Sequence, residues 1–268
     1  MSVKESNAMS KPAYQFITTE ACRHVYTVTI NRPDLMNALH PPASQELADA
    51  WDRFAADPEL WVGIITGAGD RAFCAGNDLK YTASGGDMTM PPSGFGGLTS
   101  RFDCNKPIIA AVGGVAMGGG FEIALASDII IASETARFAL PEPRVGLAAL
   151  AGGMQRLPRQ IGLKNAMAML LTGRHVDAPE AYRLGLVQEV TPPAELLPRA
   201  NAWADEINRC APLSVRASKA VALGSLGVPL DEAMNKNFKE LGDLFGSEDF
   251  REGPRAFAEK RKPNWKGR

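Results

Sequence analysis

Glu122 is the residue of this sequence whose surroundings most favour proton transfer. It follows three consecutive glycines, residues 118–120, and lies in an otherwise apolar segment, residues 121–126. Because a carboxylate in apolar surroundings is costly to ionise, we expect burial to raise its pKa into the range that suits acid/base catalysis. The alternative is a structural ion pair with an arginine such as Arg137 or Arg144.

Glu142 is a second candidate for proton transfer. It stands between Pro141 and Pro143, and two prolines restrict the backbone on either side of it. A rigid mount of this kind suits a side chain that must be held in one position. The alternative is an ordinary solvated carboxylate in a turn.

The three glycines before Glu122 suit the first turn of a helix that follows an apolar strand, residues 106–112. The first N–H groups of a helix have no partner inside it, and glycine lets another molecule approach them, so the site suits an anion or a developing oxyanion. Close helix packing is the other use of such glycines. A nucleotide-binding loop is not indicated, because Gly119 rather than lysine follows Gly118.

A second glycine-containing loop, residues 67–80, is predicted to end at a short helix capped near Asn77 or Asp78. It offers another set of outward-facing N–H groups, although an ordinary glycine turn with such a cap would look the same. Cys74 in this loop invites a nucleophile hypothesis. No histidine lies near it in sequence, so a small buried cysteine is the favoured interpretation.

Composition limits the classes of function. The chain has 268 residues and a net charge of −1, which allows one sizeable core and argues against a polyanion or nucleic acid as main partner. It contains no apolar run long enough for a membrane span and no secretory signal pattern, so no membrane partner is expected. Its four cysteines and three histidines are scattered, which predicts no metal site, no disulfide framework and a reducing cytoplasm. No G-x-S-x-G motif supports a serine hydrolase.

Strands and helices are predicted to alternate up to about residue 192, and helical periodicity prevails from residue 193 onward. Two strands are expected within residues 13–32 with a turn at 20–23, and a helix over 42–56. Further strands are expected at 61–66, 106–112, 128–132, 136–140 and 186–190. Helices are expected after residue 118, over 154–171 with a break at Gly162, and over 178–184. Residues 82–97 read as a mobile loop with methionines suited to apolar ligands.

These motifs together resemble the crotonase, or enoyl-CoA hydratase, superfamily from about residue 14 to the end of the chain. The matching pieces are Asn31-Arg-Pro with Asn37-Ala-Leu, Ala72-Phe-Cys-Ala-Gly-Asn-Asp-Leu79, Lys106-Pro-Ile-Ile-Ala-Ala-Val, Gly118-Gly-Gly-Phe-Glu122, Pro141-Glu142, Gly152-Gly-Met-Gln-Arg-Leu157 and Lys260-Arg-Lys262.

The resemblance implies an α/β fold, a spiral of ββα units followed by a helical trimerisation region. It divides the chain into a flexible tail (1–12), a spiral core domain (13–192) and a C-terminal helical oligomerisation region (193–268). A homotrimer, or a hexamer built as a dimer of trimers, is the expected assembly.

The resemblance also assigns roles to residues. The backbone N–H groups of Asn77 and Gly119 would form an oxyanion hole for the thioester carbonyl. Glu122 would activate a water and Glu142 would handle the proton at the α-carbon.

The CoA-binding and substrate-binding residues would be Ala75, through its carbonyl to adenine, together with Asp78 and Leu79, and Lys260 near the phosphates. Two departures from the hydratase pattern bear on these assignments. Leu150 lies where that pattern often has a glycine-rich turn, and Asp34 stands where some relatives have a CoA-contacting lysine.

The function expected is that of a cytoplasmic 2-enoyl-CoA hydratase, a lyase of fatty acid metabolism. It would need no cofactor beyond the CoA of its acyl-CoA substrate, and no metal. The alternatives are a specialised acyl-CoA dehydratase of the carnitinyl-CoA type, and a double-bond isomerase that uses Glu142 alone. RNA binding by a crotonase relative and a trimer without catalysis stay as further alternatives; the last requires both glutamates to be ion-paired and inaccessible.

Overall fold

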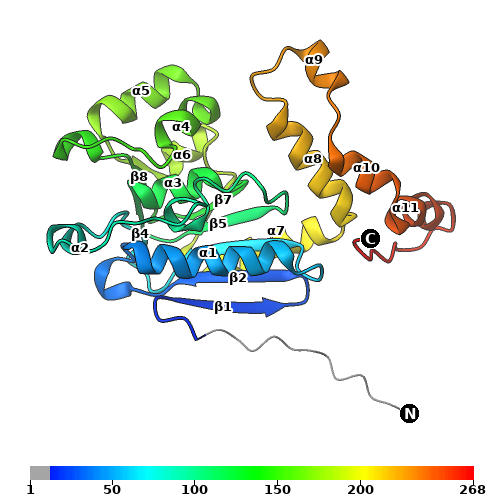
Figure 1. The fold of residues 1–268 in the computed structure, drawn as a ribbon, viewed down its shortest axis with the longest axis horizontal. Coiled ribbons are helices and arrows are strands. Elements are labelled where there is room, and N and C mark those ends of the chain that lie inside the picture. The colour runs from blue at the N-terminus through cyan, green and yellow to red at the C-terminus, as the bar shows by residue number, and fades with distance from the viewer. Residues whose placement is uncertain (1–12) are drawn as a thin grey trace.

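Two sheets form the frame of the protein in a computed structural model that describes residues 13–268 (Figure 1). The larger sheet has six strands in the order β1-β2-β3-β5-β7-β10, and the smaller has four in the order β4-β6-β8-β9. The strands are β1 Ile17–Cys22, β2 Val25–Ile30, β3 Val62–Gly67, β4 Ala72–Cys74, β5 Ile108–Val112, β6 Val115–Met117, β7 Ile129–Ser133, β8 Arg137–Ala139, β9 Val176–Asp177 and β10 Glu189–Thr191. The predicted flexible tail, residues 1–12, lies outside the described residues.

The helices follow the strands in a repeating order. They are α1 Pro41–Ala56, α2 Leu79–Ala83, α3 Gly119–Ala126, α4 Gly153–Ile161, α5 Leu163–Thr172, α6 Ala178–Arg183, α7 Leu196–Asn208, α8 Pro212–Gly224, α9 Leu230–Asn235, α10 Lys239–Phe245 and α11 Glu248–Ala258. In the successive units β3-β4-α2, β5-β6-α3 and β7-β8-α4, the first strand joins the larger sheet and the second joins the smaller one. This repetition is the spiral of ββα units that the family resemblance implies.

The central strands of the larger sheet are buried on both faces, as parallel strands covered on both sides must be. On β5, Ile108, Ala110 and Val112 belong to the core shared with α1 and α3. The alternate residues Ile109 and Ala111 belong to a second core, to which α7 contributes Leu196, Ala200 and Ala204. The period of two along the strand therefore requires a helix on each face of the sheet.

Helix α7 opens the segment predicted to oligomerise, yet it packs on the core sheet. Helices α8 to α11 lie to one side of the core in Figure 1, and α8 packs against α10. Oligomerisation through residues 193–268 stays a prediction.

Several element predictions are confirmed and a few are wrong. Helix α1 begins one residue before its predicted start, and Gly162 separates α4 from α5 as expected. The turn predicted at residues 20–23 is misplaced, because β1 continues through Cys22 and the chain turns at Arg23, which has a φ of 54°. The strand predicted at 186–190 is shifted to Glu189–Thr191. The segment predicted as a mobile loop contains a buried 3₁₀ turn, Phe95–Gly97.

Candidate active site

Three parallel strands of the smaller sheet bring the predicted site residues to one edge. Strand β4 pairs with β6 and β6 with β8, both in parallel. Because neighbouring parallel strands end at the same edge, the loops that follow them lie side by side. Asn77, Gly119 and Glu142 each come two or three residues after the end of their strand. Short strands separated by long stretches of sequence therefore place these three residues together.

The backbone N–H groups of Asn77 and Gly119 are available to a ligand. Among residues 13–268 neither group donates a hydrogen bond to another residue. Gly76, with a φ of 94°, brings the two loops together: a Cβ there would lie 3.2 Å from the Gly119 nitrogen. Gly119 is also the first residue of α3, where the helix dipole favours negative charge. This arrangement can hold an oxyanion.

The glycines at the start of α3 are required by close packing. A Cβ on Gly119 would lie 2.5 Å from the Phe95 ring, and one on Gly120 only 2.0 Å from the Cys74 carbonyl oxygen. The thiol of Cys74 is fully buried, and burial raises its pKa to about 12. Cys74 is thus a small core residue, and the nucleophile hypothesis is not supported.

Glu122 lies on the first turn of α3 and is 3% exposed. Its Oε1 accepts a hydrogen bond of 2.8 Å from the N–H of Gly153, at the start of α4. Burial raises the pKa of Glu122 to about 7; the Gly153 N–H opposes this rise, and the charge of Glu142 adds to it. A carboxyl that titrates near neutrality can both take and give a proton.

Glu142 begins a 3₁₀ turn, Glu142–Val145, three residues after the end of β8. Its side chain lies against the glycine before α3, because a Cβ on Gly118 would be 2.9 Å from Glu142 Oε1. Burial raises the pKa of Glu142, and its Oε2 is buried without a hydrogen-bond partner among the described residues. An unpartnered buried carboxyl oxygen is costly unless a ligand uses it.

The structural ion-pair alternative is not supported by the described part of the chain. No lysine, arginine or histidine there forms an ion pair with Glu122 or Glu142. Arg137 donates to the carbonyl of Ala136, and Arg144 donates to the carbonyl of Thr172. Glu122 is therefore buried and Glu142 half-buried, the charge of Glu142 raises the pKa of Glu122, and neither carboxyl forms an ion pair within residues 13–268.

The residues predicted to bind CoA lie partly beside this pair. Ala75 donates its N–H to the carbonyl of Met36, and its own carbonyl has no hydrogen-bond partner among residues 13–268. Leu79, the first residue of α2, is 56% exposed. Both positions are therefore open to a ligand.

The carboxylate of Asp78, in contrast, is bonded to other residues of the protein. It caps α2 by accepting from the N–H of Tyr81, and it forms a 3.0 Å ion pair with Arg32. Burial alone would raise the pKa of Asp78, but these two partners hold it below its usual range. Its N–H donates to the carbonyl of Leu39 and its carbonyl accepts from the N–H of Thr82, so Asp78 positions the Asn77 loop, and its predicted role in substrate binding stays a prediction.

Lys260 is not brought to the other site residues within one chain. It follows α11, which lies on the opposite side of the molecule from α2 in Figure 1. Leu150 projects from the loop before α4 and is 81% exposed, which leaves it free to contact a substrate. Asp34 lies in the 3₁₀ turn Pro33–Leu35. Roles for all three in substrate binding stay predictions.

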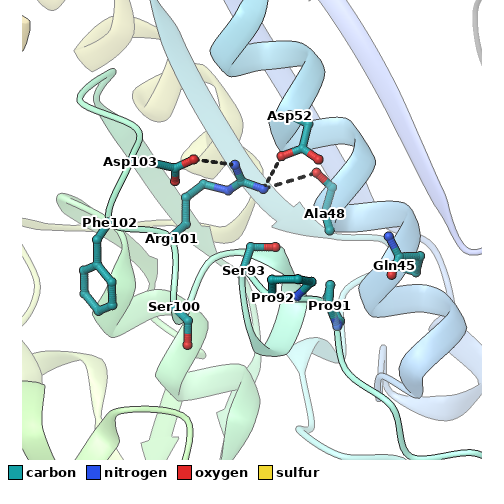
Figure 2. A pocket seen from close by; sticks show the side chains of 10 residues that line it. All are labelled: Gln45, Ala48, Asp52, Pro91, Pro92, Ser93, Ser100, Arg101, Phe102 and Asp103. Atoms are coloured by element: carbon teal, nitrogen blue, oxygen red, sulfur yellow. Dashed lines mark hydrogen bonds and ion pairs between the residues drawn. The ribbon is translucent and has the colours of Figure 1, made fainter.

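A pocket of about 540 Å³ lies between α1 and residues 91–103, and neither Glu122 nor Glu142 lines it (Figure 2). Arg101 is its buried cation, and Figure 2 shows it bonded to Asp52, Asp103 and the carbonyl of Ala48. Its charge is thus already matched inside the protein. No cluster of three metal-binding side chains occurs in residues 13–268, and no helix there is long and apolar enough to cross a bilayer.

The sequence did not single out Arg156, whose positive charge lowers the pKa of Glu122 in the structure. It appears only inside the Gly152-Gly-Met-Gln-Arg-Leu157 motif. The signal that could have found it is the pair of glycines just before a helix, because such a pair often marks a close approach by another group.

Comparison with known proteins gives consistent matches over nearly the whole chain. The family model described as enoyl-CoA hydratase/isomerase matches residues 20–268. Carnitinyl-CoA dehydratase from Proteus mirabilis (strain HI4320) is 44% identical over 250 residues, covering 91% of this chain and 95% of that protein.

Solved structures also match. The enoyl-CoA hydratase from Mycobacterium tuberculosis H37Rv superposes with a TM-score of 0.89 at 40% identity, covering 94% of this chain and 99% of that one. Carnitinyl-CoA hydratase from Mycobacterium avium superposes with a TM-score of 0.77 at 44% identity, covering 95% and 100%. The predicted α/β spiral is thus confirmed.

Proposed function

Because this chain belongs to the enoyl-CoA hydratase/isomerase family, we propose that it catalyses the reversible addition of water across the α,β double bond of an acyl-CoA thioester. The observation that carries this proposal is the pair formed by buried Glu122 and half-buried Glu142, whose pKa values burial raises and which form no ion pair among residues 13–268. They lie at the sheet edge that also carries the unpartnered N–H groups of Asn77 and Gly119.

Each group has one task in the proposed reaction. The N–H groups of Asn77 and Gly119 donate to the thioester oxygen, which gains negative charge when a nucleophile adds to the β-carbon. Glu122 in its carboxylate form takes a proton from water as the water oxygen bonds to the β-carbon. Glu142 in its protonated form gives a proton to the α-carbon as the enolate collapses. The reverse sequence is dehydration, and the CoA of the substrate is the only cofactor involved.

The reaction needs one ionised and one protonated carboxyl. Burial raises the pKa of both glutamates, and the charge of Glu142 adds to the rise at Glu122, so the two carboxyls titrate as a coupled pair. The proposal therefore predicts a bell-shaped dependence of kcat/KM on pH.

Dehydration of carnitinyl-CoA is the second candidate for the physiological reaction. It is favoured by the relatives of 44% identity whose names are carnitinyl-CoA dehydratase and carnitinyl-CoA hydratase. This reaction uses the same two glutamates and differs in the group beyond the β-carbon. The exposed Leu150 is one position where that group could be distinguished.

The experiment follows the absorbance of the conjugated enoyl thioester. Loss of absorbance with crotonyl-CoA supports the general hydratase, and a gain with carnitinyl-CoA at a much higher kcat/KM supports the specialised dehydratase. A double-bond isomerase would instead convert a 3-enoyl-CoA and keep its turnover in Glu122→Gln. Absence of all three activities in folded protein that binds CoA would reject the proposal.

The proposal includes self-association and a cytoplasmic location. The chain after α7 exposes large apolar side chains: Leu223, Leu226, Leu230, Met234, Phe245, Phe250 and Phe257. A second copy of the chain is the partner proposed for them. Analytical ultracentrifugation tests this, and a monomer at micromolar concentration would contradict it. All four cysteines are free, as a reducing compartment favours.

A further inference from the structure

We infer that Arg156 is a positioning residue for Glu122, and that it acts by fixing the turn at residues 151–153 whose backbone holds the Glu122 carboxyl. The changes in kinetics that this inference predicts depend on the proposed function. Its structural part rests on contacts within the described chain.

Arg156 is tied to two separate loops. One terminal nitrogen donates to the carbonyl of Thr99 at 2.9 Å, and the other lies 3.5 Å from the carbonyl of Ala151. Its backbone N–H donates to the carbonyl of Gly152 at 2.8 Å. The guanidinium also lies 5.7 Å from the centre of the Phe102 ring. One side chain thus connects residues 99–102 to the turn beside Glu122.

Two glycines, Gly152 and Gly153, lie between the Arg156 and Glu122 side chains. Gly152 has a φ of 99°, and a Cβ there would lie 2.1 Å from the nearer guanidinium nitrogen. A Cβ on Gly153 would lie 3.0 Å from Oε1 of Glu122, and the Gly153 N–H donates to that oxygen. A movement of the guanidinium therefore displaces the hydrogen bond that orients Glu122.

Charge adds to this mechanical link. Burial raises the pKa of Glu122 and Glu142 adds to the rise, whereas Arg156 is the cation that lowers it. Burial in turn lowers the pKa of Arg156 itself, and its half-buried guanidinium forms no ion pair among residues 13–268. Arg156 therefore supplies positive charge to the Glu122 site while bonding only to carbonyls.

The first test compares Arg156→Met and Arg156→Lys with Arg159→Met. Arg159 lies on the same helix, α4, but is exposed and donates to the carbonyl of Gln155, one turn earlier. We expect Arg156→Met to lower kcat/KM at pH 7 by about 10-fold to 100-fold, because a misplaced reacting group costs that much. The acidic limb of its pH profile should move upward by roughly half a pH unit or more, because a nearby cation is lost. Arg156→Lys keeps the positive charge, so the acidic limb of its pH profile should stay close to that of wild type. Its kcat/KM at pH 7 should still fall, because lysine cannot make both carbonyl contacts of the guanidinium.

The second test displaces the guanidinium without removing it. Gly152→Ala forces its Cβ into the space of the Arg156 guanidinium, whereas Gly162→Ala introduces a similar positive-φ strain with no atom within 4 Å. Gly152→Ala should therefore reproduce the kinetic effect of Arg156→Met. Gly162→Ala should lower the thermal midpoint and leave the pH profile unchanged.

A substrate-free measurement separates this inference from the proposed function. Protein labelled with ¹³C at the glutamate carboxyls is titrated by NMR, and the Glu122 signal is assigned from Glu122→Gln. The inference predicts a higher Glu122 pKa in Arg156→Met and in Gly152→Ala than in wild type, whether or not any acyl-CoA is turned over. Unchanged titration in both variants, or an equal shift in Arg159→Met and Gly162→Ala, would overturn it. If Arg156→Met does not fold, Arg156→Lys and Gly152→Ala decide the matter.

Discussion

Replacing Glu122 by glutamine is expected to stabilise the protein at alkaline pH while it removes catalysis. The pKa of Glu122 rises from 4.5 to about 7 on folding, chiefly because folding buries the carboxyl. The native state therefore keeps a proton that the unfolded chain releases above pH 4.5. The contribution of Glu122 to stability falls as pH rises from about 4.5 to about 7, and then stays constant.

The size of this effect follows from the two pKa values. They differ by about 2.5 pH units, which corresponds to about 3 kcal/mol in the free energy of unfolding. Solvent screening does not reduce the figure much, because Glu122 is only 3% exposed. Glutamine keeps an oxygen that can accept from Gly153, and it has no charge to bury.

The assay is urea unfolding of wild type and Glu122→Gln at pH 5 and pH 8, at one protein concentration. The free energy of unfolding of the variant relative to wild type should rise between the two pH values by about 2 to 3 kcal/mol. Any packing cost of the amide is the same at pH 5 and pH 8. The change in relative free energy of unfolding between the two pH values therefore reports only the ionisation of Glu122. Glu134→Gln, at an exposed position, is the control and should show no such change. A relative stability of Glu122→Gln that is flat or falls with pH would refute the reasoning.

Three other substitutions test the site. Gly120→Ala should lower the free energy of unfolding by about 3 kcal/mol, measured by urea denaturation, because its Cβ would lie 2.0 Å from a carbonyl oxygen of β4 that cannot move freely. Gly119→Ala should fold, because the Phe95 ring can swing aside, but should lose kcat more than CoA affinity in steady-state kinetics. Cys74→Ala should keep its turnover, and wild-type Cys74 should resist iodoacetamide in the native protein, since burial raises its pKa to about 12; inactivation through Cys74 would contradict the assignment.

The parts of the fold that were predictable are those with long, regular apolar patterns. Helix α1 and the buried strands β3, β5 and β7 each have such a pattern. The strands β4, β6 and β9 were missed because they have only two or three residues, and two of them lie among glycines. Pairing with neighbours distant in sequence stabilises them, and no local pattern records such pairing.

The candidate site divides in the same way. Glu122 was predictable because a carboxyl within an apolar helical segment is conspicuous, and Glu142 because two prolines enclose it. The role of Arg156 was not, since it depends on carbonyl groups 57 and 5 residues away and on the space left by Gly152. Every residue has a backbone carbonyl, so the types of the residues that accept these hydrogen bonds do not reveal the contact.

The most direct test of the two-glutamate account is hydration of crotonyl-CoA by wild type, Glu122→Gln and Glu142→Gln, followed as loss of enoyl-thioester absorbance. Binding of CoA is measured alongside by calorimetry. The account predicts rapid loss in wild type and a fall of several orders of magnitude in each variant, with CoA affinity retained. Undiminished turnover in either variant, or wild-type protein that binds CoA tightly and hydrates neither crotonyl-CoA nor the dehydration product of carnitinyl-CoA, would contradict it.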